Sequence, residues 1–319
     1  MLPDAEVSKL AERVLQQVNA VIVGKADRVR LLLCALLSRR HILLEDVPGT
    51  GKTLLVRALA RSLGASVARL QFTPDLLPSD VTGFSAYDPG TGEFHFRPGP
   101  IFHHLILVDE INRASPKTQA SLLECMEERQ VTVDGTTYPL PQPFLVLATQ
   151  NPVEQEGTFP LPEAQLDRFG LKLALGYPDR EIEASLLARA FESDPLQRVT
   201  QVATMEEIIQ AQAVCAQVYL DGSLRRYIID ILEATRNHHD VALGASPRAG
   251  LAVAALSQAH AAISGRDYVL PDDIKAVVPA ALPHRIVLAA GARWREQNPE
   301  IIVQQILRSL AVPTGVGRR

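Results

Sequence analysis

The sequence predicts an α/β fold, in which a parallel five-stranded sheet covered by helices precedes a smaller all-helical domain. In residues 1–176, short apolar runs with strand character alternate with stretches of helical periodicity. Such alternation is typical of a parallel sheet that is buried on both faces. Residues 177–319 are rich in Ala, Leu and Ile at helical spacing, with few strand-like segments. We therefore expect two domains, at 1–176 and 177–319.

Five apolar runs are the expected strands of the sheet. They are residues 42–45, 67–72, 105–109, 144–150 and 171–174. Helical spacing of apolar residues is clear at 54–63 and 117–128. Two other segments, 84–97 and 130–139, place Pro-Gly-Thr-Gly and Asp-Gly between short arms, a pattern that predicts β-hairpins. Because the sheet is complete without these hairpins, we expect both to project from it.

The composition excludes several classes of protein. The chain has 319 residues, of which 47% are hydrophobic and 21% charged, with a net charge of −4. These values are ordinary for a globular protein and disfavour nucleic-acid binding by bulk charge. The longest apolar run, 31–37, is too short to span a membrane. The first residues mix acids and bases without the apolar core of a signal peptide, so we expect a cytoplasmic location.

The cysteines and the paired histidines suggest no metal centre. Cys34, Cys125 and Cys215 lie far apart in apolar helical patterns, without a CxxC pair, so we expect reduced, buried thiols. The doublets at 103–104 and 238–239 consist of adjacent histidines. Adjacent side chains on a strand or helix point in different directions, and no second ligand pair stands at a useful spacing. We therefore expect no metal at either doublet.

The segment ILLEDVPGTGKT, residues 42–53, runs from an apolar strand through a glycine-rich loop into a helix. Gly49 and Gly51 allow the backbone to curl so that successive N–H groups face a phosphate. Lys52 can reach the β- and γ-phosphates of a nucleotide, and the Thr53 hydroxyl can bind Mg²⁺. The segment therefore predicts a nucleotide-binding P-loop.

One position departs from the usual P-loop pattern, G-x-x-x-x-G-K-[ST]. Asp46 stands where glycine is usual. The backbone nest that binds phosphate depends mainly on residues 48–53, so we still expect nucleotide binding there. The residues expected to contact the nucleotide are Pro48, Gly49, Thr50, Gly51, Lys52 and Thr53.

Two other strands end in side chains suited to phosphate chemistry. The run LILVDE ends in Asp109 and Glu110. Asp109 is placed to hold the hydration shell of Mg²⁺, and Glu110 can polarise a water for attack on the γ-phosphate. The strand at 144–150 leads into Asn151, whose amide can position that water by hydrogen bonding.

Two arginines have notable contexts. Arg168 lies in EAQLDRFG, just before the last expected strand, and Arg248 lies in GASPRAG, at the start of an expected helix of the second domain. A guanidinium can stabilise the charge on a transferring phosphate and can link its position to the nucleotide state. Most single arginines are solvated surface residues, so the surrounding motifs decide their interpretation.

Taken together, four segments resemble the MoxR family of AAA+ ATPases. They are EDVPGTGKT, DEINRASPKTQASLLECMEERQVTVDG, LATQNPVEQEGTFPLPEAQLDRF and GASPRA. The resemblance extends from about residue 21 to about residue 283, and the DEINRASPKTQ stretch is far more specific than a P-loop alone. It implies a P-loop AAA+ αβα core with a helical lid, and Mg-ATP bound between the subunits of a ring, commonly a hexamer.

The resemblance also implies roles for single residues. Lys52 and Thr53 correspond to Walker A, Asp109 and Glu110 to Walker B, and Asn151 to sensor 1. Arg168 matches the arginine finger that enters a neighbour's site, and Arg248 matches sensor 2, acting within its own subunit or across the interface. The hairpin at 84–97 matches the helix-2 insertion, and that at 130–139 the pre-sensor hairpin. Val23 and Gly24 resemble the loop beside the adenine.

Members of this family are thought to be chaperone-like ATPases that remodel, mature or load metal or cofactor into partner complexes, often with a von Willebrand factor A domain. Two alternatives stay open. One is a nucleic-acid-directed motor, as in the minichromosome maintenance helicases, although the hairpins carry few basic residues. The other is a nucleotide-gated switch with little hydrolysis. The ATPase subunit of magnesium chelatase shares the same architecture, and partner stimulation would distinguish it.

Overall fold

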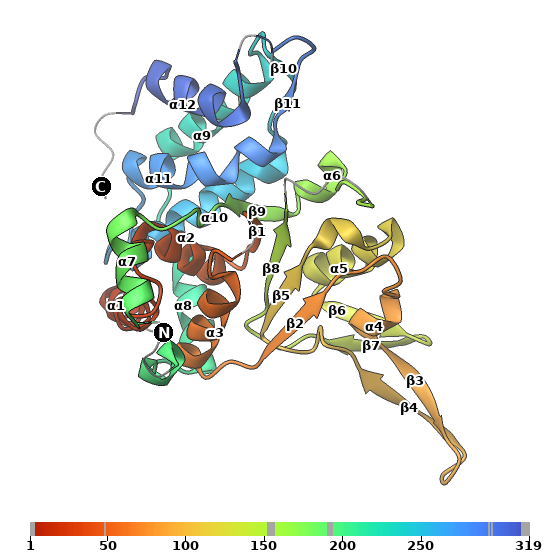
Figure 1. Ribbon diagram of the computed structural model, residues 1–319. Coiled ribbons are helices and arrows are strands. Elements are labelled where there is room, and N and C mark those ends of the chain that lie inside the picture. Colours follow the sequence, from red (N-terminus) through yellow and green to blue (C-terminus); the bar gives the residue numbers. More distant parts are fainter. Residues whose placement is uncertain are drawn as a thin grey trace.

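A computed structural model describes residues 4–47, 49–151, 157–189, 194–292, 294 and 296–313. Its centre is a five-stranded sheet in the order β2-β5-β8-β1-β9, and all its paired neighbours run parallel (Figure 1). The strands are β1 (His41–Glu45), β2 (Val67–Gln71), β5 (Leu105–Asp109), β8 (Leu145–Gln150) and β9 (Phe169–Leu173). The predicted parallel sheet and its five strands are therefore confirmed.

Helices cover both faces of the sheet. On one side lie α1 (Asp4–Asn19), α2 (Ala26–Leu37), α3 (Lys52–Leu63) and α8 (Met205–Cys215), and on the other α4 (Pro78–Thr82) and α5 (Pro116–Glu128) (Figure 1). The strand pleat divides the core: Ile42 and Leu44 of β1 belong to the first layer, and Leu43 between them belongs to the second. Purely apolar strands such as β1 and β5 are explained by this burial on both faces.

The C-terminal part is mainly helical. It contains α9 (Gly222–Arg236), α10 (Pro247–Ile263), α11 (Pro271–Ala281) and α12 (Pro299–Ser309). Two helices flank β9 before this part begins: α6 (Glu163–Leu166) precedes the strand, and α7 (Arg180–Arg189) follows it. The C-terminal part also holds a short antiparallel pair, β10 (Val241–Leu243) with β11 (Val287–Leu288), which the sequence pattern did not predict. Apolar residues of α1–α3 and of α8–α11 share one buried cluster. The helical region therefore packs directly against the helices that cover the sheet.

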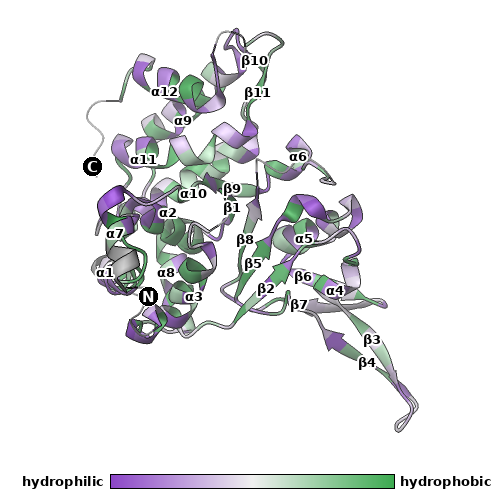
Figure 2. Ribbon diagram, in the orientation of Figure 1, coloured by the Kyte–Doolittle hydropathy of each residue, from purple (hydrophilic) through white to green (hydrophobic). Residues whose placement is uncertain are grey.

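Both expected hairpins are present. β3 (Gly83–Asp88) pairs with β4 (Glu93–Pro98), and β6 (Gln130–Val133) pairs with β7 (Thr136–Pro139). The β3–β4 hairpin extends away from the rest of the molecule (Figure 1). Its base is fixed by Phe96, whose ring stacks on Tyr138 of β7 with centroids 4.1 Å apart. Hydropathy colouring shows apolar residues on this hairpin although it lies outside the core (Figure 2).

The cysteines agree with their sequence interpretation. Cys34, Cys125 and Cys215 are free and buried. Burial raises the pKa of the Cys125 thiol to about 12 and raises that of Cys34 as well. Such thiols react slowly, because the thiolate is the reactive form. Among the described residues, we find no helix of the length and apolar character needed to cross a membrane.

Candidate functional site

The glycine-rich loop joins β1 to α3 at the carboxyl edge of the sheet. Gly49 and Gly51 have φ values of 83° and 88°, in the left-handed region that glycine adopts without strain. α3 begins at Lys52, so the first N–H groups of the helix are free of intrahelical partners and can face an anion. Pro48, which the sequence also assigns to the nucleotide, lies outside the described residues.

A cavity of about 430 Å³ lies against this loop. It collects residues from the ends of four strands, where ligands of open α/β sheets usually bind. Its lining residues are Asp46, Gly49, Thr50, Gly51, Lys52, Thr53, Leu54, Arg69, Gln71, Asp109, Glu110, Thr149, Gln150 and Asn151. The structure therefore brings together the described P-loop residues, both acidic residues and the asparagine that the sequence singled out.

Lys52 is held within the loop. Its Nζ donates hydrogen bonds to the carbonyl oxygens of Asp46 and Val47, both at 3.1 Å. Thr53 follows it in the first turn of α3 and also lines the cavity. The ammonium group is thus at the cavity wall, where a phosphate oxygen could replace the two carbonyl groups as its partner.

Asp109 ends β5 and is almost fully buried. Its Oδ2 accepts a hydrogen bond from Arg69 Nε at 2.6 Å, and Thr149 Oγ1 lies 3.5 Å from Oδ1. Arg69 and Thr149 come from β2 and β8, the strands on either side of β5. A carboxylate and a hydroxyl group are oxygen donors of the kind that Mg²⁺ prefers. Asp109 and Thr53 therefore have suitable chemistry for that ion.

Glu110 adopts a left-handed backbone conformation, with φ of 57°. Its N–H donates to Thr149 Oγ1 at 3.0 Å, which fixes the turn after β5. Its Oε2 accepts hydrogen bonds from Gln71 Nε2 at 2.9 Å and from Arg113 Nη1 at 3.1 Å. A strained turn of this kind is common where a side chain must be aimed at a ligand.

Asn151 follows β8 and is buried at the wall of the same cavity. Arg69, Gln71 and Thr149 were not singled out from the sequence, although each lies in this cavity. For Arg69 and Gln71 the available signal was weak, since they are polar residues at alternate positions of β2, an edge strand of the sheet. Such positions are also ordinary at the edge of a sheet.

The two selected arginines lie together but outside this cavity. Arg248 Nη2 donates to Glu127 Oε1 at 2.7 Å, and Arg168 Nε lies 3.3 Å from Glu127 Oε2. Glu127 belongs to the last turn of α5. One carboxylate on the core therefore holds arginines from the β9 side and from the helical region at the same point.

Buried polar contacts fix the segments that carry these arginines. Asp167 Oδ2 accepts from the hydroxyl of Ser246, the N-cap of α10, at 2.8 Å. Arg285 donates from Nη2 to the carbonyl oxygens of Asp167 at 3.1 Å and Phe169 at 2.7 Å. Burial lowers the pKa of Arg285 to about 10, with the nearby Asp167 acting in the opposite direction. Arg168 and Arg248 therefore extend from one junction, which consists of residues 167–169, Ser246 and Arg285 and is held together by these hydrogen bonds.

Val23 and Gly24 are not part of the cavity lining. A Cβ on Gly24 would come within 2.2 Å of the Ile182 side chain, so the loop packs closely on α7. The next residue, Lys25, donates from Nζ to the carbonyl oxygen of Tyr177 at 2.9 Å. The structure places this loop beside the segment that leads from β9 to α7.

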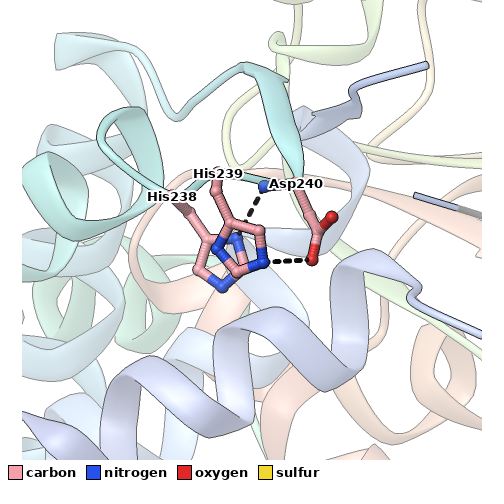
Figure 3. Close-up of side chains that lie close together, drawn as sticks. All are labelled: His238, His239 and Asp240. Carbon is pink, nitrogen blue, oxygen red and sulfur yellow. Dashed lines mark hydrogen bonds and ion pairs between the residues drawn. The ribbon is translucent and has the colours of Figure 1, made fainter. Parts of the chain in front are cut away.

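The histidine doublets behave differently from each other. His103 and His104 contact different groups, Pro100 O and the Ser66 hydroxyl. The rings of His238 and His239 are stacked, with centroids 4.6 Å apart and planes 21° apart (Figure 3). The expectation that adjacent side chains diverge is therefore wrong for this second doublet.

With Asp240, the second doublet forms a group whose ligand atoms lie within 4.8 Å of one another, close enough to hold a metal ion. His238 Nδ1 accepts from the Asp240 N–H at 3.2 Å, and His239 Nε2 lies 3.0 Å from Asp240 Oδ2 (Figure 3). The nitrogen lone pairs lie in the ring planes, so the nearly parallel rings direct them side by side and not toward one common point. We therefore interpret these three residues as part of the turn between α9 and β10.

The fold and the cavity define a class of protein: a P-loop nucleotide-binding core with a helical lid. Comparison with known families agrees. Residues 41–171 match the ATPase family associated with various cellular activities (AAA), and residues 233–306 match the AAA lid domain. AAA membership implies nucleotide binding.

One named relative identifies the family, and two further matches extend over nearly the whole chain. The chain is 42% identical to Chaperone MoxR1 of Mycobacterium tuberculosis, with 97% of this chain and 84% of the relative covered. It is 50% identical to the uncharacterized protein YeaC of Bacillus subtilis, with 97% and 96% covered. The crystal structure of a protein from Cytophaga hutchinsonii matches with a TM-score of 0.91 and 40% identity, over 98% and 97% of the chains. The chain belongs to the MoxR family of AAA+ ATPases, as its motifs indicated.

Proposed function

We propose that this protein hydrolyses Mg-ATP at the cavity beside its P-loop. The observation that carries the proposal is that one cavity collects Lys52, Thr53, Asp109, Glu110 and Asn151. Backbone N–H groups at the start of α3 and the Lys52 ammonium group would bind the phosphates. Thr53 and Asp109 would hold Mg²⁺, which would stabilise charge on the phosphates when bound. Glu110 would orient and deprotonate the attacking water, and Asn151 would align it.

The first test of this proposal is nucleotide binding by the wild type and by Lys52→Ala. We expect the wild type to bind a fluorescent ATP analogue with Mg²⁺, and the variant to lose most of that affinity, because the side chain supplies the positive charge nearest the phosphates. Lys117→Ala is a matched control, since its side chain is an exposed lysine on α5 outside the cavity. Equal binding by Lys52→Ala and the wild type would contradict the proposal.

We propose further that Arg168 and Arg248 both act on the nucleotide of a neighbouring subunit. Support comes from their position: they share Glu127 and neither lines its own subunit's cavity. A hexameric ring is the assembly that would bring this junction to the next cavity. On this view residues 1–176 are the nucleotide-binding core with its hairpins, and residues 177–319 are the linker helices and lid.

We propose that the free energy of ATP hydrolysis drives the remodelling, the maturation, or the metal or cofactor loading of partner protein complexes. A relative is named as a chaperone, and a protein with a von Willebrand factor A domain is the partner class that the family suggests. We propose the cytoplasm as its location, where the three free cysteines would stay reduced. Stimulation by a nucleic acid would instead favour a motor, and binding without turnover would favour a switch.

The β3–β4 hairpin is the proposed client-engaging element. Tyr87 and Phe94 face each other across its strands, 56% and 71% exposed, with ring centroids 5.3 Å apart. We expect deletion of residues 86–96 to uncouple partner remodelling from hydrolysis. A milder variant, Tyr87→Ser with Phe94→Ser, leaves the Phe96 anchor in place and should do the same.

These hairpin variants are checked by measuring ATPase rate and partner remodelling side by side. Thr132→Ser in the other hairpin is a matched control, because it keeps the hydroxyl group that contacts Thr137. We expect the ATPase rate to stay near the wild-type value while remodelling is lost. Unchanged remodelling in the double variant would show that this hairpin does not engage the partner.

A further inference from the structure

Asp46 makes contacts that a glycine at this P-loop position could not make. Its side chain is only 6% exposed. Oδ1 accepts from the N–H of Val47 at 3.0 Å, and Oδ2 accepts from the N–H groups of Leu175 at 2.8 Å and Gly176 at 3.1 Å. Gly176 has φ of 64°, a conformation in which successive N–H groups converge on one anionic oxygen. The carboxylate thus joins the phosphate loop to a segment 129 residues away.

That segment is the connection between the sheet and the helical region. It leaves β9 at Leu173 and enters α7 at Arg180. The same segment is held at a second point, where Lys25 Nζ donates to the carbonyl oxygen of Tyr177. Within the described part of the P-loop, Asp46 accepts hydrogen bonds from this connection.

A neighbouring ionic contact reinforces the connection. Glu45, the residue before Asp46, pairs with Lys172 of β9, and Lys172 Nζ lies 3.9 Å from Glu300 in the first turn of α12. Glu45 and Asp46 are therefore both linked to the helical region or to the connection that leads to it. Glu45 is linked through the side chains of Lys172 and Glu300, and Asp46 through the backbone N–H groups of Leu175 and Gly176.

We infer that Asp46 is a positioning residue that couples the phosphate loop to the lid through the connection at Leu175 and Gly176. This inference rests on the proposed function, because the signal that it transmits is a nucleotide bound at the P-loop. When phosphates draw the loop toward them, the connection follows, because the loop and the connection share one buried carboxylate. Hinges of this kind absorb backbone changes in a few residues between rigid bodies.

The isosteric variant Asp46→Asn tests the coupling. An amide has one oxygen, so either Val47 or the Leu175–Gly176 pair must face an NH₂ donor instead of an acceptor. Asp46→Gly is the second variant: it restores the usual P-loop residue and removes every side-chain contact. Asp221→Asn is the matched control, because Asp221 also accepts a backbone N–H, from Ser223 at 2.7 Å, but lies at the start of α9.

The readout is the distance between the core and the lid. Fluorophores are attached at Arg61→Cys on α3 and Asp230→Cys on α9, both exposed positions, while the native cysteines are buried. Labelled subunits are diluted into an excess of unlabelled subunits of the same variant. The distance is measured with and without a non-hydrolysable ATP analogue and Mg²⁺, beside nucleotide affinity, KM and kcat.

We expect the analogue to shift the distance in the wild type and in Asp221→Asn, but not in the two Asp46 variants. These variants should still bind nucleotide, with KM little changed, while kcat falls by about 10²-fold, as is typical when a change remote from the chemistry misplaces catalytic groups by about 1 Å. A wild-type shift that persists in both Asp46 variants would overturn the inference, as would a wild type that binds nucleotide without any shift. A wild type that binds no nucleotide would overturn the proposed function itself.

Discussion

Replacing Glu110 with Gln is expected to stop ATP hydrolysis while leaving ATP bound. The amide keeps an oxygen for the hydrogen bonds from Gln71 and Arg113, so the turn after β5 should be retained. It cannot accept the proton of the attacking water, and loss of a general base typically lowers a rate by about 10²–10⁴-fold. Phosphate release in a single turnover measures the loss, and nucleotide affinity measured in parallel shows that the site is intact.

A matched control for this substitution is Glu124→Gln, which changes an exposed glutamate on α5 outside the cavity. It should hydrolyse ATP at the wild-type rate. Hydrolysis by Glu110→Gln at a rate close to that of the control would mean that another group activates the water. The nearest candidate carboxylate would then be Asp109, which Arg69 now holds at 2.6 Å.

Arg168→Ala is expected to reduce kcat by about 10³–10⁵-fold, the contribution typical of an arginine finger. ATP affinity should change little, because Arg168 does not line the cavity of its own subunit. Stability should also change little, since the side chain is part-exposed and its contact is an ion pair with Glu127 at 3.3 Å. Steady-state ATPase rates and thermal unfolding measure these effects.

Arg13→Ala is the matched control for that variant. Arg13 forms an exposed ion pair with Glu207 at 3.0 Å, on the helical face away from the junction, so its removal reports the cost of losing such a pair. We expect wild-type activity from this control. A similar loss of activity in both variants would indicate a general effect on folding or assembly.

The sequence predicted those parts of the fold that depend on local pattern. The strand at 105–109 was placed as observed, since burial on both faces leaves a continuous apolar run. The last strand was predicted at 171–174 but spans Phe169–Leu173, with Gly170 inside it. Glycine fits at this position because a Cβ there would come within 2.4 Å of the Arg40 side chain. The β10–β11 pair was missed because it joins very short segments that are far apart in the chain.

The distinction between local sequence pattern and contacts between distant segments also applies to the site. The P-loop, Asp109, Glu110 and Asn151 could be found from the sequence because each follows an apolar strand, and parallel strands end at one edge of the sheet. The contacts of Asp46 and Glu127 could not, since they join segments that only the packed structure brings together. The family resemblance implied roles for the arginines, whereas their common partner, Glu127, is apparent only in the structure.

We propose that each hydrolytic site is completed by an arginine from the neighbouring subunit. ATPase activity per subunit, measured in mixtures of the wild type and Arg168→Ala across a range of protein concentrations, distinguishes a shared site from an independent one. We expect activity per subunit to rise with concentration, and activity to fall more steeply than the wild-type fraction as the variant is added. Activity that is independent of concentration and proportional to the wild-type fraction would contradict the claim.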